Sequence, residues 1–394
     1  MKSQFRGFLF EAKHLTGLLV AAAAVAVFLY MEVAAVGQSM GSALPQTPQA
    51  PKDNPTTPAK VALGKLLFWD PLLSGPQDVA CASCHHPQNG YAEDRDLSLG
   101  VTAIGLGSKR RQAPGSSIPI VKRNSPTVLN IAFSGSDQSG SYDPATAPMF
   151  WDLRVKSLEK QALEPLKAHE EMRGDTYPED EALAKVVAKL QANAEYRSLF
   201  AAAFGSAQPV SAENLGRAIA AFERTLLANN SPFDRYMRGD RSAMTEEQVS
   251  GMKRFESVGC IKCHNGPMFS DYKLHVMGVP DNPALPASDD GAEKTYAFRT
   301  PTLRNLNFTA PYEHNGMFRT LSDVVGFYED ARGGRSRNPN VSSEKLDPLV
   351  RELGDFDEED VDLVEFLRAL SDDSFDRTIP ERVPSGLPVG GKIQ

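Results

Sequence analysis

The 394-residue chain is poor in residues that often carry special chemistry, with only four cysteines, seven histidines and two tryptophans. It also has no excess of positive charge, since its formal net charge is −8. This balance argues against a nucleic-acid-binding protein, which usually carries a basic face, and better suits a small molecule or a basic protein as partner. No stretch alternates convincingly between apolar and polar residues, so the sequence predicts a mainly α fold.

One long hydrophobic run, residues 15–31, follows three basic residues near the start of the chain. Its length lies between that of a signal-peptide core and that of a membrane-spanning helix. Residues 1–37 are therefore predicted to be a cleaved signal peptide or a retained membrane anchor. Either predicts export to the periplasm, and an anchor would tether the protein to the inner membrane. Residues 38–57, rich in Pro, Thr and Gln, are predicted to form a flexible linker.

All the cysteines fall in two copies of the pattern C-x-x-C-H, which comprise Cys81, Cys84 and His85, and Cys260, Cys263 and His264. In an exported protein such cysteines could form disulfides, redox dithiols or parts of a zinc site. The histidine after each pair argues against these, because histidine is rare in this chain. The distance between the two pairs also exceeds the usual spacing of paired zinc knuckles.

The two motifs are therefore predicted to attach two covalent c-type haems, each through thioether bonds from two cysteines to the haem vinyl groups. His85 and His264 would be the proximal iron ligands. Disulfides and redox dithiols remain the alternatives.

An internal repeat supports two haem domains. Each motif follows a glycine, three residues, a phenylalanine and a short break. Helix signals precede both copies, since Thr57 and Pro58 are typical of a helix start and Thr245–Gln248 form a capping box. We expect two tandem cytochrome-c-like helical domains and a disordered Pro- and Gly-rich tail. Their predicted boundaries are 58–238, 239–376 and 377–394.

Further helices are predicted where apolar residues recur at three- and four-residue spacing, within 178–204 and 212–229. Near the C-terminus, one apolar helix face is predicted to comprise Val361, Val364, Leu367 and Leu370.

Several stretches, in order along the chain, resemble signatures of the bacterial di-haem cytochrome c peroxidase family. The resemblance covers about residues 58–372 and rests on "GKLLFWDPLLSG", "RNSPTVLN", "FWDLRVKSLEKQALEPLKAHEEM", "CIKCHNGP" and "RTPTLRNLNFTAPYEHNGMFRTLSDVVGFYED". It implies a peroxidatic N-terminal haem, a C-terminal haem that receives electrons, and a tryptophan between them.

By position, the resemblance assigns this tryptophan to Trp151 and the distal pocket of the first haem to Gln161, Pro165 and Glu171. Cleavage of the peroxide O–O bond needs a group that takes a proton from one oxygen and returns it to the other, as a carboxylate can. Glu171 would be this acid and base, and Gln161 would orient peroxide or water. Without the resemblance, Glu171 would be interpreted as a solvated acid and Trp151 as a core aromatic.

Two positions depart from the classical peroxidases. Tyr328 stands fourteen residues after His314, where those enzymes have a methionine ligand, and this resembles the MauG branch, whose second haem has His and Tyr ligands. A phenolate would lower the potential of that haem, whereas methionine would raise it. A buried core tyrosine is the alternative. No histidine lies between His86 and His169, and position 101 is valine, so the first haem is expected to be open without prior reduction.

The family also binds calcium between the haems, and the resemblance assigns its ligands to Asn124, Thr309 and Pro311. Together these features predict a di-haem peroxidase that reduces hydrogen peroxide with electrons from a small c-type cytochrome or a cupredoxin. One alternative is a MauG-like oxidase that spends the stored oxidising equivalents on a partner protein. Another is a non-catalytic electron carrier or sensor, which would require six ligands on both irons.

Overall fold

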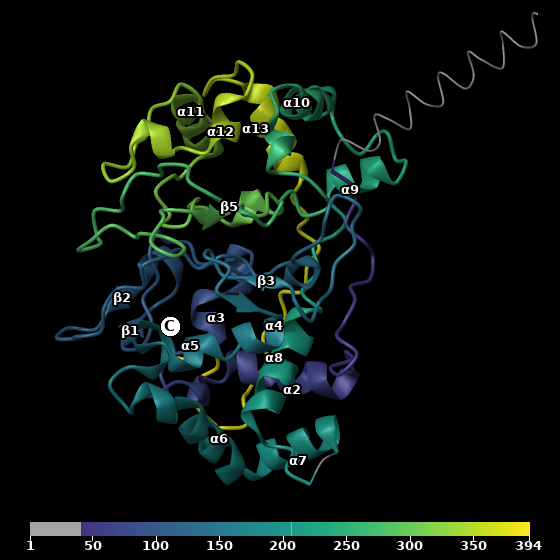
Figure 1. Cartoon of the computed structure of the whole chain (residues 1–394). Helices are drawn as coiled ribbons and strands as arrows, with labels where there is room; N and C mark the ends of the chain where they lie inside the picture. Colours follow the sequence, from purple (N-terminus) through teal and green to yellow (C-terminus); the bar gives the residue numbers. More distant parts are fainter. Residues whose placement is uncertain (1–40, 206) are drawn as a thin grey trace, which may run out of the picture. The chain divides into compact units, whose positions relative to one another are not determined.

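The computed structural model describes residues 41–205 and 207–394, and Figure 1 shows the chain coloured along its sequence. The predicted signal peptide or anchor, residues 1–37, lies outside the described residues. Within them, no helix combines the length and apolar character needed to cross a membrane. Residues 42–394 form one compact unit, so the domain boundaries at 238 and 376 stay predictions.

The described part is mainly helical, as the sequence predicted. Its α-helices are α2 (Pro58–Trp69), α3 (Cys81–Cys84), α4 (Leu158–Gln161), α5 (Glu164–Lys167), α6 (Ala182–Ala192), α7 (Ala194–Phe204), α8 (Ala212–Glu223), α9 (Pro232–Met237), α10 (Glu246–Ser257), α11 (Leu321–Arg332), α12 (Pro348–Arg351) and α13 (Val361–Ala369). Short strands form three antiparallel pairs: β1 (Ala103–Ile104) with β2 (Arg111–Gln112), β3 (Pro148–Met149) with β4 (Val155–Lys156), and β5 (Leu274–His275) with β6 (Phe298–Arg299). Helices and long loops therefore position the site.

The sequence repeat corresponds to one type of helix pair that is used twice. Helix α2 packs on α8, and α10 packs on α13. Each pair makes its closest approach at a glycine, because a Cβ on Gly64 would overlap the Ala218 carbonyl and one on Gly251 would overlap the Asp362 carbonyl. The phenylalanine four residues after each glycine is buried in the core. The repeated glycine and phenylalanine thus pack the helix that precedes each C-x-x-C-H motif.

The helix signals in the sequence are largely confirmed. Thr57 caps α2, and the capping box at Thr245–Gln248 opens α10. The predicted apolar face of α13 is wrong at its first residue, because the Val361 side chain is 66% exposed. Leu363 and Phe366 are buried instead, so the inward face is rotated relative to the prediction.

The predicted flexible linker, residues 38–57, packs against distant parts of the chain over its described part. The Leu44 side chain is only 1% exposed, and its backbone N–H donates to the Asp234 carboxylate at 2.9 Å. The buried Asn54 side chain donates to Glu159 at 2.9 Å. Composition favoured disorder because large apolar residues are scarce there, but polar contacts to distant residues hold the segment in place.

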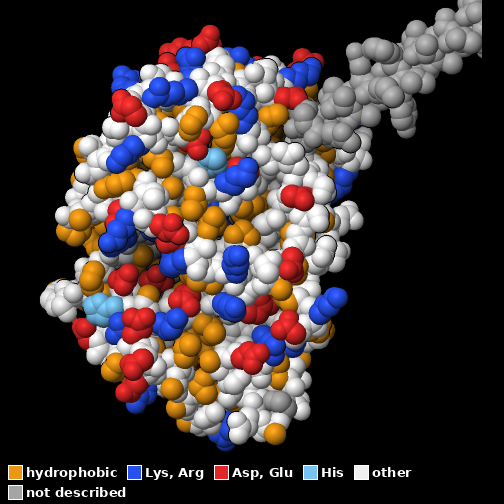
Figure 2. Space-filling view, viewed as in Figure 1, with side chains coloured by type: hydrophobic (Ala, Val, Ile, Leu, Met, Phe, Trp, Pro, Cys, Tyr) orange, Lys and Arg blue, Asp and Glu red, His pale blue; other side chains and the backbone are white. Residues whose placement is uncertain are grey.

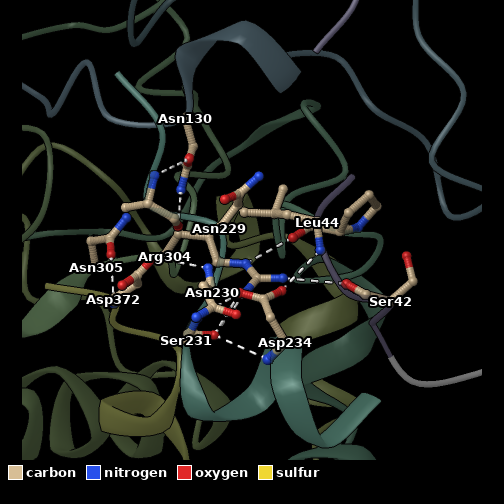
Figure 3. A network of polar contacts seen from close by, with 12 residues as sticks. Ser42, Leu44, Asn130, Asn229, Asn230, Ser231, Asp234, Arg304, Asn305 and Asp372 are labelled. Atoms are coloured by element: carbon tan, nitrogen blue, oxygen red, sulfur yellow. Dashed lines mark hydrogen bonds and ion pairs between the residues drawn. The ribbon is translucent and has the colours of Figure 1, made fainter. Parts of the chain in front are cut away.

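Figure 3 shows the polar network that holds the start of this segment. The buried Arg304 guanidinium donates to the Asp234 carboxylate at 3.0 Å and to the Ser42 carbonyl at 3.2 Å. The Ser231 hydroxyl donates to the same carboxylate oxygen of Asp234, at 2.6 Å. One buried ion pair therefore connects the N-terminal segment, α9 and the loop before α11.

The predicted disordered tail, residues 377–394, is also packed. The Ser83 hydroxyl donates to the Gly390 carbonyl at 2.8 Å. A Cβ on Gly391 would overlap the Asp78 carbonyl, and the backbone there has a φ of +80°, which favours glycine. The glycines that suggested disorder instead allow the tail to lie against the first C-x-x-C-H motif.

Candidate functional site

The four cysteines are free thiols: Cys81 and Cys84 lie in α3, Cys260 begins the short turn Cys260–Lys262, and Cys263 directly follows that turn. Burial raises the pKa of the Cys84 thiol to about 12 and that of the Cys260 thiol to about 12. A redox dithiol works through a readily formed thiolate, which such burial opposes. Neither the disulfide nor the dithiol alternative matches this arrangement.

His85 is oriented for coordination through Nε2. Its Nδ1 lies 3.1 Å from the Tyr91 carbonyl, which can only accept, so Nδ1 carries the proton. Burial lowers the pKa of His85, which favours the neutral ring. Its Nε2 is left with a lone pair and lies 3.3 Å from the Ser125 hydroxyl. A histidine fixed in this way by a carbonyl is typical of metal ligands.

His264 repeats the arrangement. Its Nδ1 lies 3.0 Å from the Phe269 carbonyl, and burial lowers the pKa of His264 to about 4. Its Nε2 faces the Tyr328 hydroxyl at 3.4 Å. The structure thus brings together the two residues predicted as axial ligands of the second haem.

Sequence reasoning missed the two aromatic residues that orient these histidines. Tyr91 and Phe269 are both buried, and both have positive φ, at +55° and +52°. This uncommon backbone turns each carbonyl back toward its histidine. A signal was present, because an aromatic residue follows each C-x-x-C-H motif within six residues of the histidine.

His85 lines a space of about 1700 Å³, which we call the His85 cavity. The structure brings every predicted distal residue to it. They are Gln161, Pro165 and Glu171, and the predicted relay Trp151 lines the same cavity. Gln161 ends α4 and Pro165 lies in α5, so two short helices and the turn at His169–Arg173 form this wall.

Glu171 has the electrostatics of a group that can exchange a proton near neutral pH. Burial, helped by the nearby negative charge of Glu170, raises the pKa of the Glu171 carboxyl to about 7, although Arg154 opposes both effects. A carboxyl with such a pKa is matched to acid and base catalysis.

Valine at position 101 lies against this wall. Its side chain is buried and its backbone N–H donates to the Glu171 carbonyl at 2.9 Å. An apolar side chain there offers no ligand atom. Among the described residues that line the cavity, His85 is the only histidine.

Two further spaces surround His264 and Tyr328. The His264 cavity, of about 1170 Å³, also contains Cys260 and Cys263. The central cavity, of about 1010 Å³, has both His264 and Tyr328 in its wall. The central cavity is also lined by the predicted calcium ligands, Asn124, Thr309 and Pro311. These three are brought together along one wall, although no ligand role follows from that alone.

Trp151 lies between the two histidine sites. Its side chain lines both the His85 cavity and the central cavity, and its indole N–H donates to the Asn124 carbonyl at 3.1 Å. Its ring lies 6.4 Å from that of His314, which lines the His264 cavity. This is the position that an electron relay would need.

The residues present fit haem in both sites. Each site places a histidine with a free Nε2 and two thiols beside one cavity. A large, flat, mostly apolar cofactor with an iron centre matches this donor set.

The chain is similar to known proteins in sequence and in fold. Residues 58–242 match the family model described as di-haem cytochrome c peroxidase. The chain is 35% identical over 343 residues to the methylamine utilization protein MauG of Methylorubrum extorquens, covering 86% of this chain and 85% of that protein. It is 35% identical over 390 residues to the cytochrome-c peroxidase IdrP1 of Pseudomonas sp. strain SCT, covering 90% and 91%.

Among solved structures, a MauG-like protein associated with microbial copper homeostasis matches with a TM-score of 0.66 and 27% identity, over 84% of this chain and 95% of that one. This likeness supports a fold of two cytochrome-c-like domains. From its sequence, its fold and its paired sites, the chain belongs to the di-haem cytochrome c peroxidase family.

Proposed function

We propose that this protein is an exported di-haem c-type peroxidase that reduces hydrogen peroxide in the His85 cavity. The observation that carries the proposal is the convergence of Glu171 and Gln161 on the cavity that His85 lines. Each haem would be attached through the two thiols of its motif. His85 would hold the first iron, and His264 with Tyr328 would hold the second.

Bound haem would supply the iron that exchanges electrons with peroxide. The chain's own residues would do the proton chemistry. The Glu171 carboxylate would take the proton from one peroxide oxygen and return it to the other, so that the leaving oxygen departs as water. The Gln161 amide would hold peroxide in line, and Trp151 would provide a path for electrons between the sites. Two electrons and two protons then convert hydrogen peroxide to two waters.

Tyr328 supports a low-potential second site. Burial raises the pKa of the Tyr328 phenol well above its usual range, so a phenolate there needs a neighbouring positive charge. A ferric ion held by His264 and Tyr328 would supply that charge. An anionic ligand would in turn favour oxidised iron at this site.

Two other uses of the same site follow from the relatives. A MauG-like oxidase would spend its oxidising equivalents on a partner protein, and the match to a protein named MauG favours this as the second candidate. A non-catalytic carrier or sensor is less favoured, because valine takes the place where the resemblance would put a histidine cap.

The remaining parts of the proposal concern surroundings and partners. Calcium would bind beside Asn124, Thr309 and Pro311, and the N-terminal segment would direct the protein to the periplasm as a signal peptide or an anchor. Figure 2 shows Lys and Arg side chains interspersed with Asp and Glu on one face. Charge on that face does not select a basic partner. A small c-type cytochrome or a cupredoxin would be the electron donor.

The proposal is tested by adding one equivalent of hydrogen peroxide to the oxidised protein without prior reduction. Optical and EPR spectra should show prompt loss of the ferric signals, because the first haem is open. If the spectra change only after one haem has been reduced, an unforeseen ligand caps the first iron. The protein would then be a classical peroxidase that needs reductive activation.

Replacing Tyr328 with methionine is expected to raise the potential of the second haem, because a neutral soft ligand replaces an anionic one. Optical redox titration of both haems measures this. Tyr312→Met is the matched control, since Tyr312 also lines the central cavity but donates its hydroxyl hydrogen to the Leu306 carbonyl. Equal potentials in the two variants would contradict ligation by Tyr328.

A further inference from the structure

Arg299 is a buried cation without a carboxylate partner. Its side chain is only 8% exposed, and its Nε has no hydrogen-bond partner among the described residues. Its guanidinium forms no ion pair in the described part of the chain, and the nearest aromatic contact is the Tyr272 ring, 5.9 Å away. Other deeply buried arginines are paired, as the distances for Arg224–Glu159 (2.7 Å), Arg304–Asp234 (3.0 Å) and Arg110–Glu93 (3.9 Å) show.

An unpaired buried cation is costly. Burial favours the neutral form and lowers the pKa of the Arg299 guanidinium, although arginine remains charged in practice. Removing such a charge from water costs several kcal/mol unless an anion compensates it. The nearest contributing carboxylate is the more distant Asp152, and the Tyr272 phenol is neutral because burial raises its pKa to about 12. The missing partner is therefore expected to be an anion that enters one of the cavities.

The position of Arg299 indicates which anion this is. Its side chain lines the His85 cavity, the central cavity and the His264 cavity. Its backbone N–H donates to the Trp151 carbonyl at 2.7 Å, which ties it to the residue between the two sites. Strand β6 holds it there by pairing Arg299 with Leu274. Whatever anion it meets belongs to the contents of these cavities.

We propose that Arg299 forms the ion pair for the carboxylate side chains of the bound porphyrins and is shared between the two haem sites. This inference rests on the proposed haem content. A c-type haem is fixed by its vinyl edge to the cysteines, and its two carboxylates extend from the opposite edge. A guanidinium binds carboxylates in a planar, bidentate manner that an ammonium group does not match.

A shared cation has a consequence for electron transfer. Oxidised iron carries one more positive charge than reduced iron, so a fixed positive charge nearby favours the reduced form. Arg299 acts on both sites because its side chain reaches the cavities of both. It is a positioning residue that tunes the two potentials together, beside the tryptophan that links them.

The test compares three variants of the haem-containing protein. Arg299→Gln removes the charge, and Arg299→Lys keeps the charge but loses the bidentate geometry. Arg319→Gln is the control, because Arg319 is exposed and the charge change is the same. The measurements are the midpoint potentials of both haems by optical redox titration, and the porphyrin carboxylate bending modes by resonance Raman spectroscopy.

Arg299→Gln should lower both potentials and shift the carboxylate modes, Arg299→Lys should keep potentials near wild type with shifted modes, and Arg319→Gln should change neither. If Arg299→Gln does not fold, shifted modes in Arg299→Lys alone still support the pair. Potentials and modes equal to those of Arg319→Gln would overturn it. Neither readout needs peroxide, so a wild type that ignores peroxide refutes the proposed function while leaving this assignment to be judged by its own spectra.

Discussion

Replacing Glu171 with glutamine is expected to slow peroxide reduction about 10²- to 10⁴-fold, the usual contribution of a positioned acid and base. Glutamine keeps the size of the side chain and removes the group that carries the proton. The protein should still fold, because burial disfavours the charged carboxylate of Glu171 and the glutamine amide carries no charge. Stopped-flow absorbance after mixing with peroxide measures the rate.

The pH dependence separates this role from a structural one. Because burial raises the pKa of Glu171 to about 7, the base form is present above that pH and is lost below it. The wild-type rate should therefore rise with pH through about 7 and then level off, and the Glu171→Gln rate should lack this rise. Glu181→Gln, at an exposed position, serves as the control. If the rate of Glu171→Gln depends on pH as the wild-type rate does, Glu171 is not the acid and base of the reaction.

Replacing Asp234 with alanine is expected to lower the free energy of unfolding by about 3 to 5 kcal/mol, the usual cost of leaving a buried charge unpaired. Asp234 is fully buried, and its loss would strand the Arg304 guanidinium, which is only 1% exposed (Figure 3). It would also remove the acceptor for the Leu44 backbone N–H. Urea unfolding followed by far-UV circular dichroism measures the change.

The control for this prediction is the exposed ion pair between Arg217 and Asp53, whose carboxylate side chain is 72% exposed. Asp53→Ala should change stability little, because solvent screens such pairs. Equal effects of Asp53→Ala and Asp234→Ala would mean that the buried network does not hold the N-terminal segment.

Local signals in the sequence predicted the parts of the molecule that depend on neighbouring residues. The C-x-x-C-H spacing located both histidines, and the caps at Thr57 and Thr245 located two helix starts, because these features act within one turn of chain. The convergence of Glu171 on the His85 cavity was anticipated from resemblance to a family. Spacing along the chain could not have shown it.

Features that depend on distant contacts were not predicted. The segment before Thr57 and the tail after Asp376 have compositions typical of disorder, yet both are held by partners far along the chain. The sequence did not predict a role for Arg299 either, because a single arginine in a loop-rich stretch forms no local pattern. Its significance comes only from the absence of a carboxylate partner, among the described residues, in three dimensions.

The packing of the tail against the first motif sets an order of events during biogenesis. Ser83, between the two cysteines of that motif, bonds to Gly390, and 307 residues separate them. Contacts of such long range form late, because the whole intervening chain must first be made and brought together. The first motif therefore stays uncovered until Gly390 has been made and brought to it, and during this interval its thiols are most accessible.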